Sequence, residues 1–438
     1  MRTPRAFGPA LLLLLSTLAL PGSSLAGGEL PEADLLARAV LESNPELLAI
    51  EAQIEAMEAG TRRASVWSDP MLATEYSNMA FARPYPGGHA MSGVQLRLQQ
   101  TIPFPGKIAA REAAAEGRVL VTAASLPERQ NLLIGAVRTR WVQLGLTRQL
   151  RRITRSHIEL LSQLAEVVQV RTEVGKANQV ELQRLLLLRR RLEDDLGDFD
   201  RDEALLLATL NASLHRPAGT LIETLATYPR VPAPASLEVL VASAHSDDPA
   251  LARLRATERA EQLETSAARS ERRPDVTAWA GYRFRGGVPG GDPGEDFFSV
   301  GASIPLPWFW NDRRWGALEA THDARGRVAT AQAASRRDQL RGAIEAARVR
   351  LARAIAKGTA YRDHLVPKAH AVLDATFAVY PTGKAQFESV FQAELQLLDF
   401  ERGLRLAEAE GWAAHYELRT LTAENLTLAS PASDGVPR

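Results

Sequence analysis

The sequence contains no cysteine among its 438 residues. This absence excludes disulfide bonds, thiolate metal sites and lipid attachment through an N-terminal cysteine. Lysine plus arginine equals aspartate plus glutamate at 52 residues each, so the charge balance points neither to nucleic acid nor to a strongly acidic partner. Long apolar runs are also missing after residue 26, since none approaches the ~18 residues that a membrane-spanning helix needs. The sequence therefore predicts no spanning helix in the mature protein.

The first 26 residues have the pattern of an export signal. Arg2 and Arg5 provide the positive start, residues 11–20 form the apolar stretch, and Ser24-Leu25-Ala26 provides a small-x-small cleavage site. We therefore expect the mature chain to be exported. The tail at residues 429–438 is expected to be disordered.

The remaining sequence repeats itself at a spacing of about 200 residues, far longer than the period of a solenoid. Three motifs mark the two copies: Asn44-Pro45 and Asp248-Pro249, Pro103-Phe104-Pro105 and Pro305-Leu306-Pro307, Gly175-Lys176-Ala177 and Gly383-Lys384-Ala385. Pro70 and Pro274 follow the first motif of each copy at the same distance. A tandem duplication is the simplest explanation. It predicts halves at residues 28–235 and 236–428, joined by the Pro-rich stretch 228–234.

Each half contains a segment with the alternation of a half-exposed β-strand. In residues 94–99 the even positions are apolar and the odd ones polar, and residues 298–304 repeat this alternation with small residues on the polar side. Strands at residues 276–284 and 71–78 are predicted less clearly, the former because Trp279 lies on the polar side. If the sheet lies in a membrane, the residues predicted to face lipid are Val94, Leu96, Leu98, Phe298, Val300 and Ile304.

A soluble, half-buried sheet would show the same alternation, so the strands alone do not establish a membrane location. Aromatic residues gather near the strand ends, which is typical of the two aromatic girdles of an outer-membrane barrel. They are Tyr76, Phe81, Tyr85, Tyr282, Phe284 and Phe297 at one end, and Trp308, Phe309, Trp310 and Trp315 at the other. Four strands cannot close a barrel, which needs about eight, and an open edge in lipid would leave backbone groups unsatisfied. If these strands span a membrane, two, three or four chains must share one barrel.

Very long helices are predicted next to the strands. Opening helices are expected at about residues 30–66 and 236–272, and the segments 107–171 and 313–380 could each reach on the order of 100 Å as helices. Apolar and small residues recur in them at steps of three and four, which is coiled-coil spacing. Pro127 and Pro367 predict a kink in each long helix.

These features together resemble the TolC family of outer-membrane efflux channels. The resemblance rests on residues 100–107 after the second strand, and on Tyr380-Pro381-Thr382-Gly383 followed ten residues later by Ala393, with Val174-Gly175 as the first-half counterpart. Asp69-Pro70 and the Pro-Phe-Pro-Gly-Lys segment are most similar to the CzcC and CusC group of heavy-metal efflux proteins. The resemblance implies a mainly α-helical chain with a small membrane β-barrel. Long coiled-coil helices would form an α-barrel tunnel, and four strands per chain would enter a shared twelve-stranded barrel.

The resemblance also implies a function and partners. The chain would form a homotrimer in the outer membrane and dock onto a periplasmic adaptor protein and an inner-membrane pump of the resistance-nodulation-division type. It would be a passive duct without catalytic residues or a cofactor, because the pump supplies the energy. Heavy-metal cations are the expected cargo, with organic compounds or secreted polypeptides as the alternative. A second class stays open, a periplasmic coiled-coil adaptor that never spans the membrane, although an adaptor would not need two pairs of amphipathic strands.

The same resemblance assigns roles at the periplasmic tip of the tunnel. The turns Gly175-Lys176 and Gly383-Lys384 are expected to contact the adaptor, and glycine suits a tight interhelical turn with positive φ. A purely structural turn explains each of these residues equally well. The pore constriction is expected at Glu181, Tyr380, Glu388 and Gln392. Ser389 and Gln392 stand where the best-known member has aspartates, so a strongly anionic gate is not expected.

Potential metal ligands give only a weak signal. Met71, Met79, His89 and Met91 lie in one short region and would suit Cu(I). Incidental loop residues are the simpler interpretation, and no metal site is predicted. His157 lies in an apolar helical stripe and is expected to be a packed core residue. We find no constellation of histidine, acid and nucleophile that would predict an enzyme.

Overall fold

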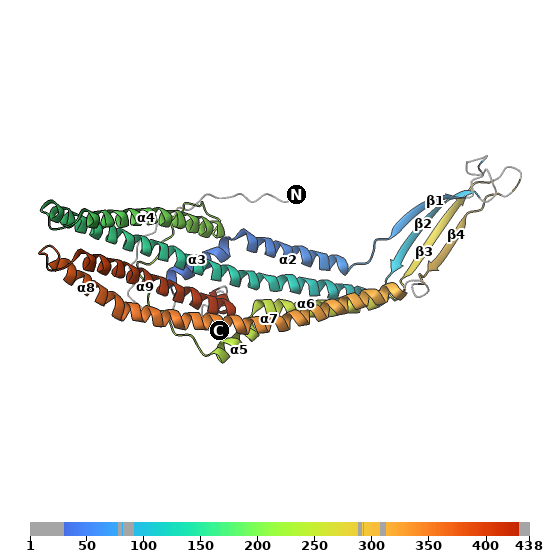
Figure 1. The fold of residues 1–438 in the computed structure, drawn as a ribbon. Helices are drawn as coiled ribbons and strands as arrows, with labels where there is room; N and C mark the ends of the chain where they lie inside the picture. The colour runs from blue at the N-terminus through green and yellow to red at the C-terminus, as the bar shows by residue number, and fades with distance from the viewer. Residues whose placement is uncertain are drawn as a thin grey trace, which may run out of the picture.

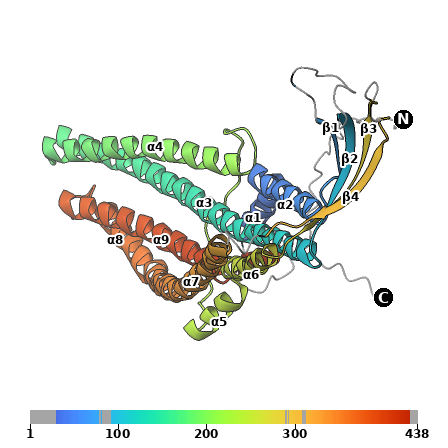
Figure 2. The same ribbon diagram turned by 90° about the vertical axis from the view of Figure 1, so that its right-hand side faces the viewer.

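The chain forms an elongated molecule with a small β-sheet at one end and a long helical body (Figure 1). The computed structural model describes residues 30–77, 81, 92–287, 291, 293–306 and 312–428. The predicted export signal and the predicted disordered tail lie outside these residues. The two helical turns farthest from the sheet form what we call the tip, and Figure 2 shows the two long helical hairpins that end there.

Each half of the chain contributes the same succession of elements. The first half contains α1 (Pro31–Ser43), α2 (Pro45–Ala64), β1 (Met71–Ser77), β2 (Gly93–Ile102), α3 (Lys107–Glu173) and α4 (Gln179–Ser213). The second contains α5 (Leu237–Asp247), α6 (Pro249–Glu271), β3 (Val276–Arg285), β4 (Phe297–Ser303), α7 (Asp312–Ala360), a π-helical turn (Tyr361–Leu365), α8 (Val366–Val379) and α9 (Phe387–Leu421), followed by the short 3₁₀ helix η2 (Glu424–Leu428). Both predicted pairs of strands are therefore present.

The four strands form one antiparallel sheet in the order β1-β2-β3-β4. Leu96 of β2 lies opposite Thr74 of β1 and Tyr282 of β3, and Tyr282 in turn lies opposite Phe298 of β4. Because side chains alternate between the two faces of a strand, this register places the even-numbered residues of all four strands on one face. The odd-numbered residues share the other face. The two halves of the chain meet directly between β2 and β3.

The predicted opening helices are each divided in two, which corrects the continuous helices expected from the sequence. The breaks fall at Asn44 and Asp248, both in an extended conformation and both followed by proline. A residue before proline is driven out of the helical region, while proline itself suits the first turn of the next helix. The Asn44 side chain accepts a hydrogen bond from the Glu46 amide, and Asp248 accepts one from the Leu251 amide. Each break is therefore a capped helix start.

The long helices are interrupted at only one of the two predicted kinks. α3 contains 67 residues and stays helical through Pro127. Ion pairs flank this proline, with Glu128 accepting from Arg253 of α6 at 2.6 Å and Arg129 reaching Glu46 of α2 at 2.5 Å. In the second half, the π-helical turn separates α7 from α8 immediately before Pro367. A widened turn is one of the usual structural causes of a kink in a helix.

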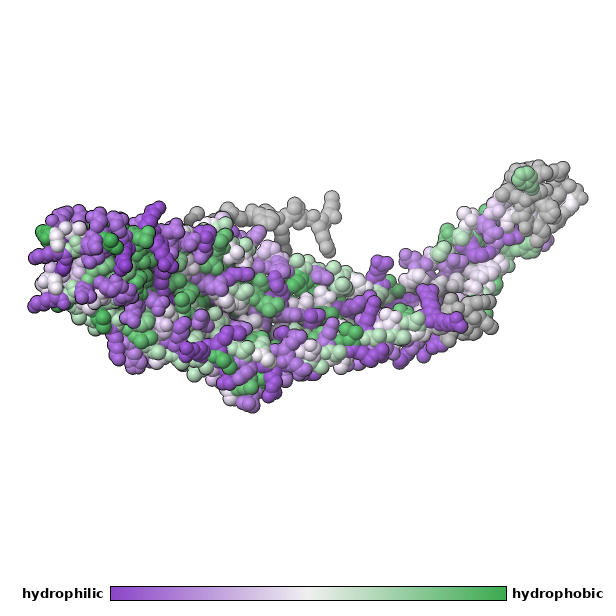
Figure 3. All heavy atoms as spheres, viewed as in Figure 1, coloured by the Kyte–Doolittle hydropathy of each residue, from purple (hydrophilic) through white to green (hydrophobic). Residues whose placement is uncertain are grey.

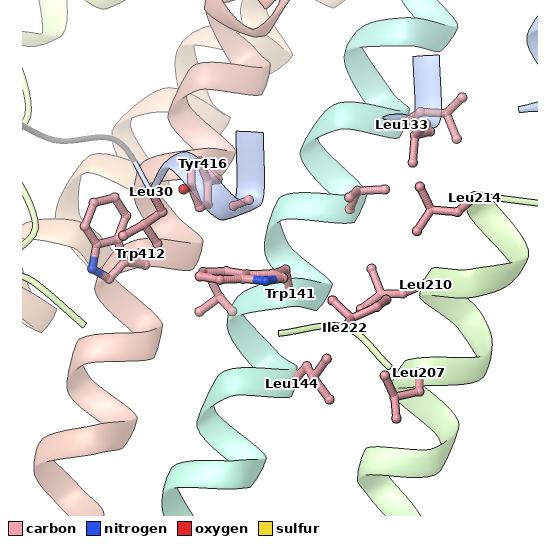
Figure 4. Packing of buried hydrophobic residues seen from close by; sticks show 14 of the residues in the cluster. Leu30, Leu133, Trp141, Leu144, Leu207, Leu210, Leu214, Ile222, Trp412 and Tyr416 are labelled. Atoms are coloured by element: carbon pink, nitrogen blue, oxygen red, sulfur yellow. The ribbon is translucent and has the colours of Figure 1, made fainter. Parts of the chain in front are cut away.

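The helical body is held by a core in which Trp141 of α3 is central (Figure 4). Figure 4 shows its indole between Trp412 and Tyr416 of α9 on one side and Leu210 and Ile222 on the other. All of these side chains are buried. Both indoles also donate hydrogen bonds to the backbone, Trp141 to the carbonyl of Glu223 at 2.9 Å and Trp412 to that of Pro229 at 3.0 Å. The segment that follows α4 is therefore fixed to α3 through Glu223 and to α9 through Pro229.

One charged group is completely enclosed in the same region. Arg138 of α3 is 0% exposed, and its Nε donates to Asp34 of α1 at 2.8 Å. Its Nη1 donates to the side chain of Asn425 in η2, and its guanidinium lies 5.1 Å from the centre of the Tyr416 ring. Burial lowers the pKa of Arg138, and the charge of Asp34 opposes that effect. This arginine thus fastens the first and last described helices of the chain to α3.

In the described part of the chain, no helix combines the length and the apolar character that crossing a membrane would require.

Candidate functional site at the helical tip and on the sheet

The tip consists of two interhelical turns that each contain a glycine in the left-handed region. Gly175 follows α3 with φ +68°, and Gly383 follows α8 with φ +79°. The amides of Lys176 and Ala177 return to the carbonyl of Arg171, and the amide of Lys384 returns to that of Val379. Positive φ is costly for residues with a Cβ, so glycine is strongly favoured at both turns. Lys176 and Lys384 are exposed beside them.

Arg171 joins the two turns to each other. Its guanidinium donates to the carbonyl of Tyr380 at the end of α8 and to that of Lys176 at 3.2 Å. The same group lies 4.5 Å from the centre of the Tyr380 ring, a cation–π contact. Tyr380 is 1% exposed, so in this conformation its ring packs between the hairpins. Burial, together with the charge of Glu181, raises the pKa of Tyr380.

The acidic residues predicted at the constriction lie in two contacts between the first and second halves. Glu181 of α4 accepts a long hydrogen bond from the Tyr380 hydroxyl at 3.4 Å. Glu388 of α9 accepts from Arg184 of α4 at 3.0 Å and from Gln392 at 2.8 Å. All four predicted residues therefore take part in contacts near the tip, one between Glu181 and Tyr380 and one among Arg184, Glu388 and Gln392. A groove of about 670 Å³ continues from there along α4, lined by Leu187, Leu188, Arg190, Arg191, Phe391 and Leu395.

The sequence interpretation missed the two arginines that connect these groups. Arg171 and Arg184 contact residues 209 and 204 positions away in the chain. Both belong to helices that are rich in arginine, so no local pattern distinguishes them. The available sequence signal was the repeat offset of about 200 residues. It aligns the two tip turns and so indicates which segments of the two halves lie near each other.

A buried cluster of charged groups lies farther along the same helices. His157 of α3 is 3% exposed; its Nδ1 lies 2.5 Å from Oε1 of Glu394, and its Nε2 lies 3.1 Å from Oε2 of Glu401, both on α9. The other oxygen of Glu401 lies 2.8 Å from Nε2 of His370 on α8. Burial opposes the charged imidazolium, but the two glutamates outweigh it and raise the pKa of His157 to about 9. His157 is therefore a core residue, as predicted, but a charged one.

Glu401 is affected in the opposite sense. Burial disfavours its charged form, but the hydrogen bond from His157 and the nearby histidine charges lower its pKa below the ordinary value. Together these groups tie α3, α8 and α9 through charge-assisted hydrogen bonds, which are stronger than neutral ones.

At the opposite end of the molecule, the sheet has one apolar face. The predicted lipid-facing residues Val94, Leu96, Leu98, Phe298 and Val300 all lie on it, and Ile304 follows β4. Phe298 and Val300 are 71% and 68% exposed, too much for core residues. Ala278, Ala280, Tyr282 and Phe284 of β3 continue this face. Within the described strands it carries no charged side chain.

The other face of the sheet is polar. It presents Glu75 of β1, Arg97 of β2 and Arg283 of β3, together with glutamine, serine and threonine. Trp279 lies on this face, as the alternation predicts, and its ring covers Gly301 of the neighbouring strand. A Cβ at Gly301 would come within 2.5 Å of the indole, so this glycine makes room for it.

A cluster of metal ligands is absent from the described residues. Within them, no group of three histidine or acidic side chains is placed to hold a metal ion. Met71 lies on the polar face of the sheet, where its sulfur lies 3.6 Å from Nε2 of Gln99. Met79, His89 and Met91 lie outside the described residues.

No protein-family model matches the sequence, and no curated protein is detectably similar to it. Solved structures are similar in fold. The outer-membrane channel OprN has a TM-score of 0.73 at 14% identity over 90% of each chain. The outer membrane protein VceC of Vibrio cholerae has 0.71 at 18% over 90% of this chain and 96% of its own. CusC, described in terms of transmembrane channel formation, has 0.71 at 16% over 90% and 92%. The chain therefore has the TolC-like fold of these outer-membrane channels, mainly helical with a four-stranded antiparallel sheet.

Proposed function

We propose that the chain is a TolC-family subunit of an outer-membrane channel, a passive exit duct that lies in the outer membrane and extends into the periplasm. The apolar, exposed face of the sheet carries this proposal. Such a face is unfavourable in water but suits the hydrocarbon region of a membrane. The polar face behind it would line an aqueous lumen. The shared fold of the channel proteins described above supports the same function.

The open edges of the sheet require a closed ring of copies, and we propose the homotrimer that the TolC resemblance implies. β1 and β4 are its edge strands, and unpaired edges are not tolerated in lipid. Pairing β1 of one copy with β4 of the next removes both edges, and three copies would make a twelve-stranded barrel. Exposed apolar residues on the helical body (Figure 3) support contacts with neighbouring copies or partners. They include Leu187, Leu205, Leu221 and Val328, each more than half exposed.

We place the partners and the cargo in this proposal as well. The tip turns with Gly175, Lys176, Gly383 and Lys384 would contact a periplasmic adaptor, and an inner-membrane pump would deliver the cargo. Heavy-metal cations are the cargo expected from the CzcC and CusC resemblance, with organic compounds or polypeptides as the alternative. CusC shares 16% identity with the chain, within the range of the other similar channels.

Fractionation and mass measurement of the detergent-extracted mature protein test the proposal. A heat-labile trimer in the outer membrane is expected. A monomer or dimer in the soluble periplasmic fraction would overturn it and favour a coiled-coil adaptor instead. Survival of a deletion strain on metal salts and on organic toxicants would then distinguish the two classes of cargo.

Val300→Asp should destabilise the assembled channel by about 2 kcal/mol per chain, because it places a carboxylate on the proposed lipid face. Ser299→Asp is the matched control, since residue 299 lies on the polar face. The measurement is the temperature at which the trimer dissociates in detergent and lipid. Equal dissociation temperatures for the two variants would contradict the assignment of the faces.

Gly383→Val should weaken efflux while leaving the trimer in the outer membrane. The substitution forces a β-branched residue to φ +79°, at a cost of about 1–2 kcal/mol, and thereby distorts the tip. Gly219→Val is a suitable control, because Gly219 has no strained φ and nothing within 4 Å of an added Cβ. Efflux and trimer content are measured in the same cells. Loss of trimer from the membrane would mean that the turn serves assembly instead.

A further inference from the structure

Three charged side chains of the polar face lie close together in what we call the charged layer. Gln95 of β2 lies opposite both Glu75 of β1 and Arg283 of β3, so these residues form one row across three strands. Arg97 follows two residues along β2 on the same face. The charged layer therefore contains two arginines and one glutamate of each chain.

Neutral groups hold the two arginines in place. Nη2 of Arg283 donates to Oε1 of Gln95 at 3.0 Å. The guanidinium of Arg97 lies 4.7 Å from the centre of the Trp279 ring, which itself rests on Gly301. These contacts orient the guanidinium groups without neutralising them. Such an arrangement keeps both positive charges on the polar face.

The single carboxylate in this layer compensates only in part. Oε2 of Glu75 lies 3.9 Å from Nη2 of Arg97, and the two side chains are 57% and 36% exposed. A pair this long and this accessible to water is weakly coupled. Arg285, at the end of β3, has acidic neighbours: its amide donates to Asp296 and its Nε to the carbonyl of Glu295. Arg285 is therefore not counted in the charge of this layer. The two arginines and one glutamate that remain give the layer an excess of positive charge.

We propose that this layer makes the channel prefer anions, which favours organic compounds in anionic form, the alternative cargo, over the free heavy-metal cations expected from the resemblance. The inference rests on the proposed trimeric channel, in which three copies would bring six arginines and three glutamates to the wall of the lumen. Rings of arginine or lysine favour anions in membrane pores, as rings of acidic residues favour cations. The positive potential would also raise the local concentration of anionic solutes at the exit. Organic anions, or metals carried as anionic complexes, fit this lumen.

Reversal potentials across a planar lipid bilayer under a KCl gradient test the inference. The purified full-length channel should prefer chloride over potassium. The double variant Arg97→Gln, Arg283→Gln should shift the reversal potential toward the cation side, and Glu75→Gln should shift it further toward the anion side. Arg230→Gln is the control, because Arg230 is an exposed arginine on the linker far from the sheet and should leave selectivity unchanged.

The possible outcomes separate this inference from the proposed function. A conducting channel that prefers potassium, or whose selectivity the double variant does not change, would overturn the inference and leave the channel intact. The measurement is repeated in an Arg171→Ala background, because a tip held closed by Arg171 would block conductance. This substitution releases the contact between the two tip turns. Absence of conductance in both backgrounds would overturn the channel itself, and the anion preference with it.

Discussion

Arg138→Met should lower the free energy of unfolding by about 3–5 kcal/mol, the usual cost of breaking a buried ion pair from one side. The reason is that the carboxyl group of Asp34, itself 8% exposed, would lose the guanidinium that binds it. Oδ1 of Asn425 would lose its hydrogen bond from Arg138 as well, while Nδ2 of Asn425 still donates to the Thr420 hydroxyl. The expected result is a marked drop in the thermal unfolding midpoint of the detergent-solubilised protein, together with loosening of α1 and η2.

Arg140→Met is the control for this variant, because Arg140 is a half-buried arginine two residues along the same helix. It should change the midpoint only slightly. The double variant Arg138→Met, Asp34→Leu should recover part of the loss, since replacing both partners by apolar residues removes the unpaired charge. Equal midpoints for Arg138→Met and Arg140→Met would show that the buried pair contributes little.

The sheet and the helical hairpins could be predicted because their signals are local or repeated. Alternation over six residues identifies β2, and the second copy confirms the pattern in β4. The register between β2 and β3 could not be predicted in the same way, since it joins residues 174 to 192 positions apart. Once the register is known, the parity of residue numbers assigns every strand residue to a face.

The breaks in the opening helices have a local signal in the sequence. Asn44-Pro45 and Asp248-Pro249 mark the two repeats, and Asn44 and Asp248 also cap α2 and α6. An Asx residue followed by proline combines a capping side chain with a residue suited to a first turn, so two short helices could have been predicted. The π-helical turn before Pro367 has no comparable sequence signal. Pro367, in the first turn of α8, predicts a kink but not the π-helical geometry of residues 361–365.

The charge of His157 could not be predicted from the sequence of its own helix. On α3 alone, the apolar neighbours of His157 predict a packed core residue. The partners Glu394 and Glu401 are 237 and 244 positions away, on a helix of the other half. Only the packing of α3 against α9 converts a buried histidine into a charged one. The consequence is a dependence on pH that the sequence does not predict.

Stability should fall as the pH rises from about 6.5 to about 9, because His157 keeps its proton in the folded state after the unfolded chain has lost it. Below 6.5 both states bind the proton, and the stabilisation from the two glutamates is fully present. Above 9 the folded state loses the proton too, and that stabilisation is gone. The rise in pKa from 6.5 to about 9 corresponds to on the order of 3 kcal/mol per chain.

The test compares thermal midpoints of the wild type and His157→Gln across this range of pH. Glutamine has no proton to lose here, so the variant should be less stable near pH 6.5 and should approach the wild type above pH 9. His364→Gln is the control, because His364 is exposed in the π-helical turn. A purely packing role for His157 predicts a difference that does not change with pH. A constant difference between wild type and variant would therefore show that the charge of His157 does not stabilise the packing of α3, α8 and α9.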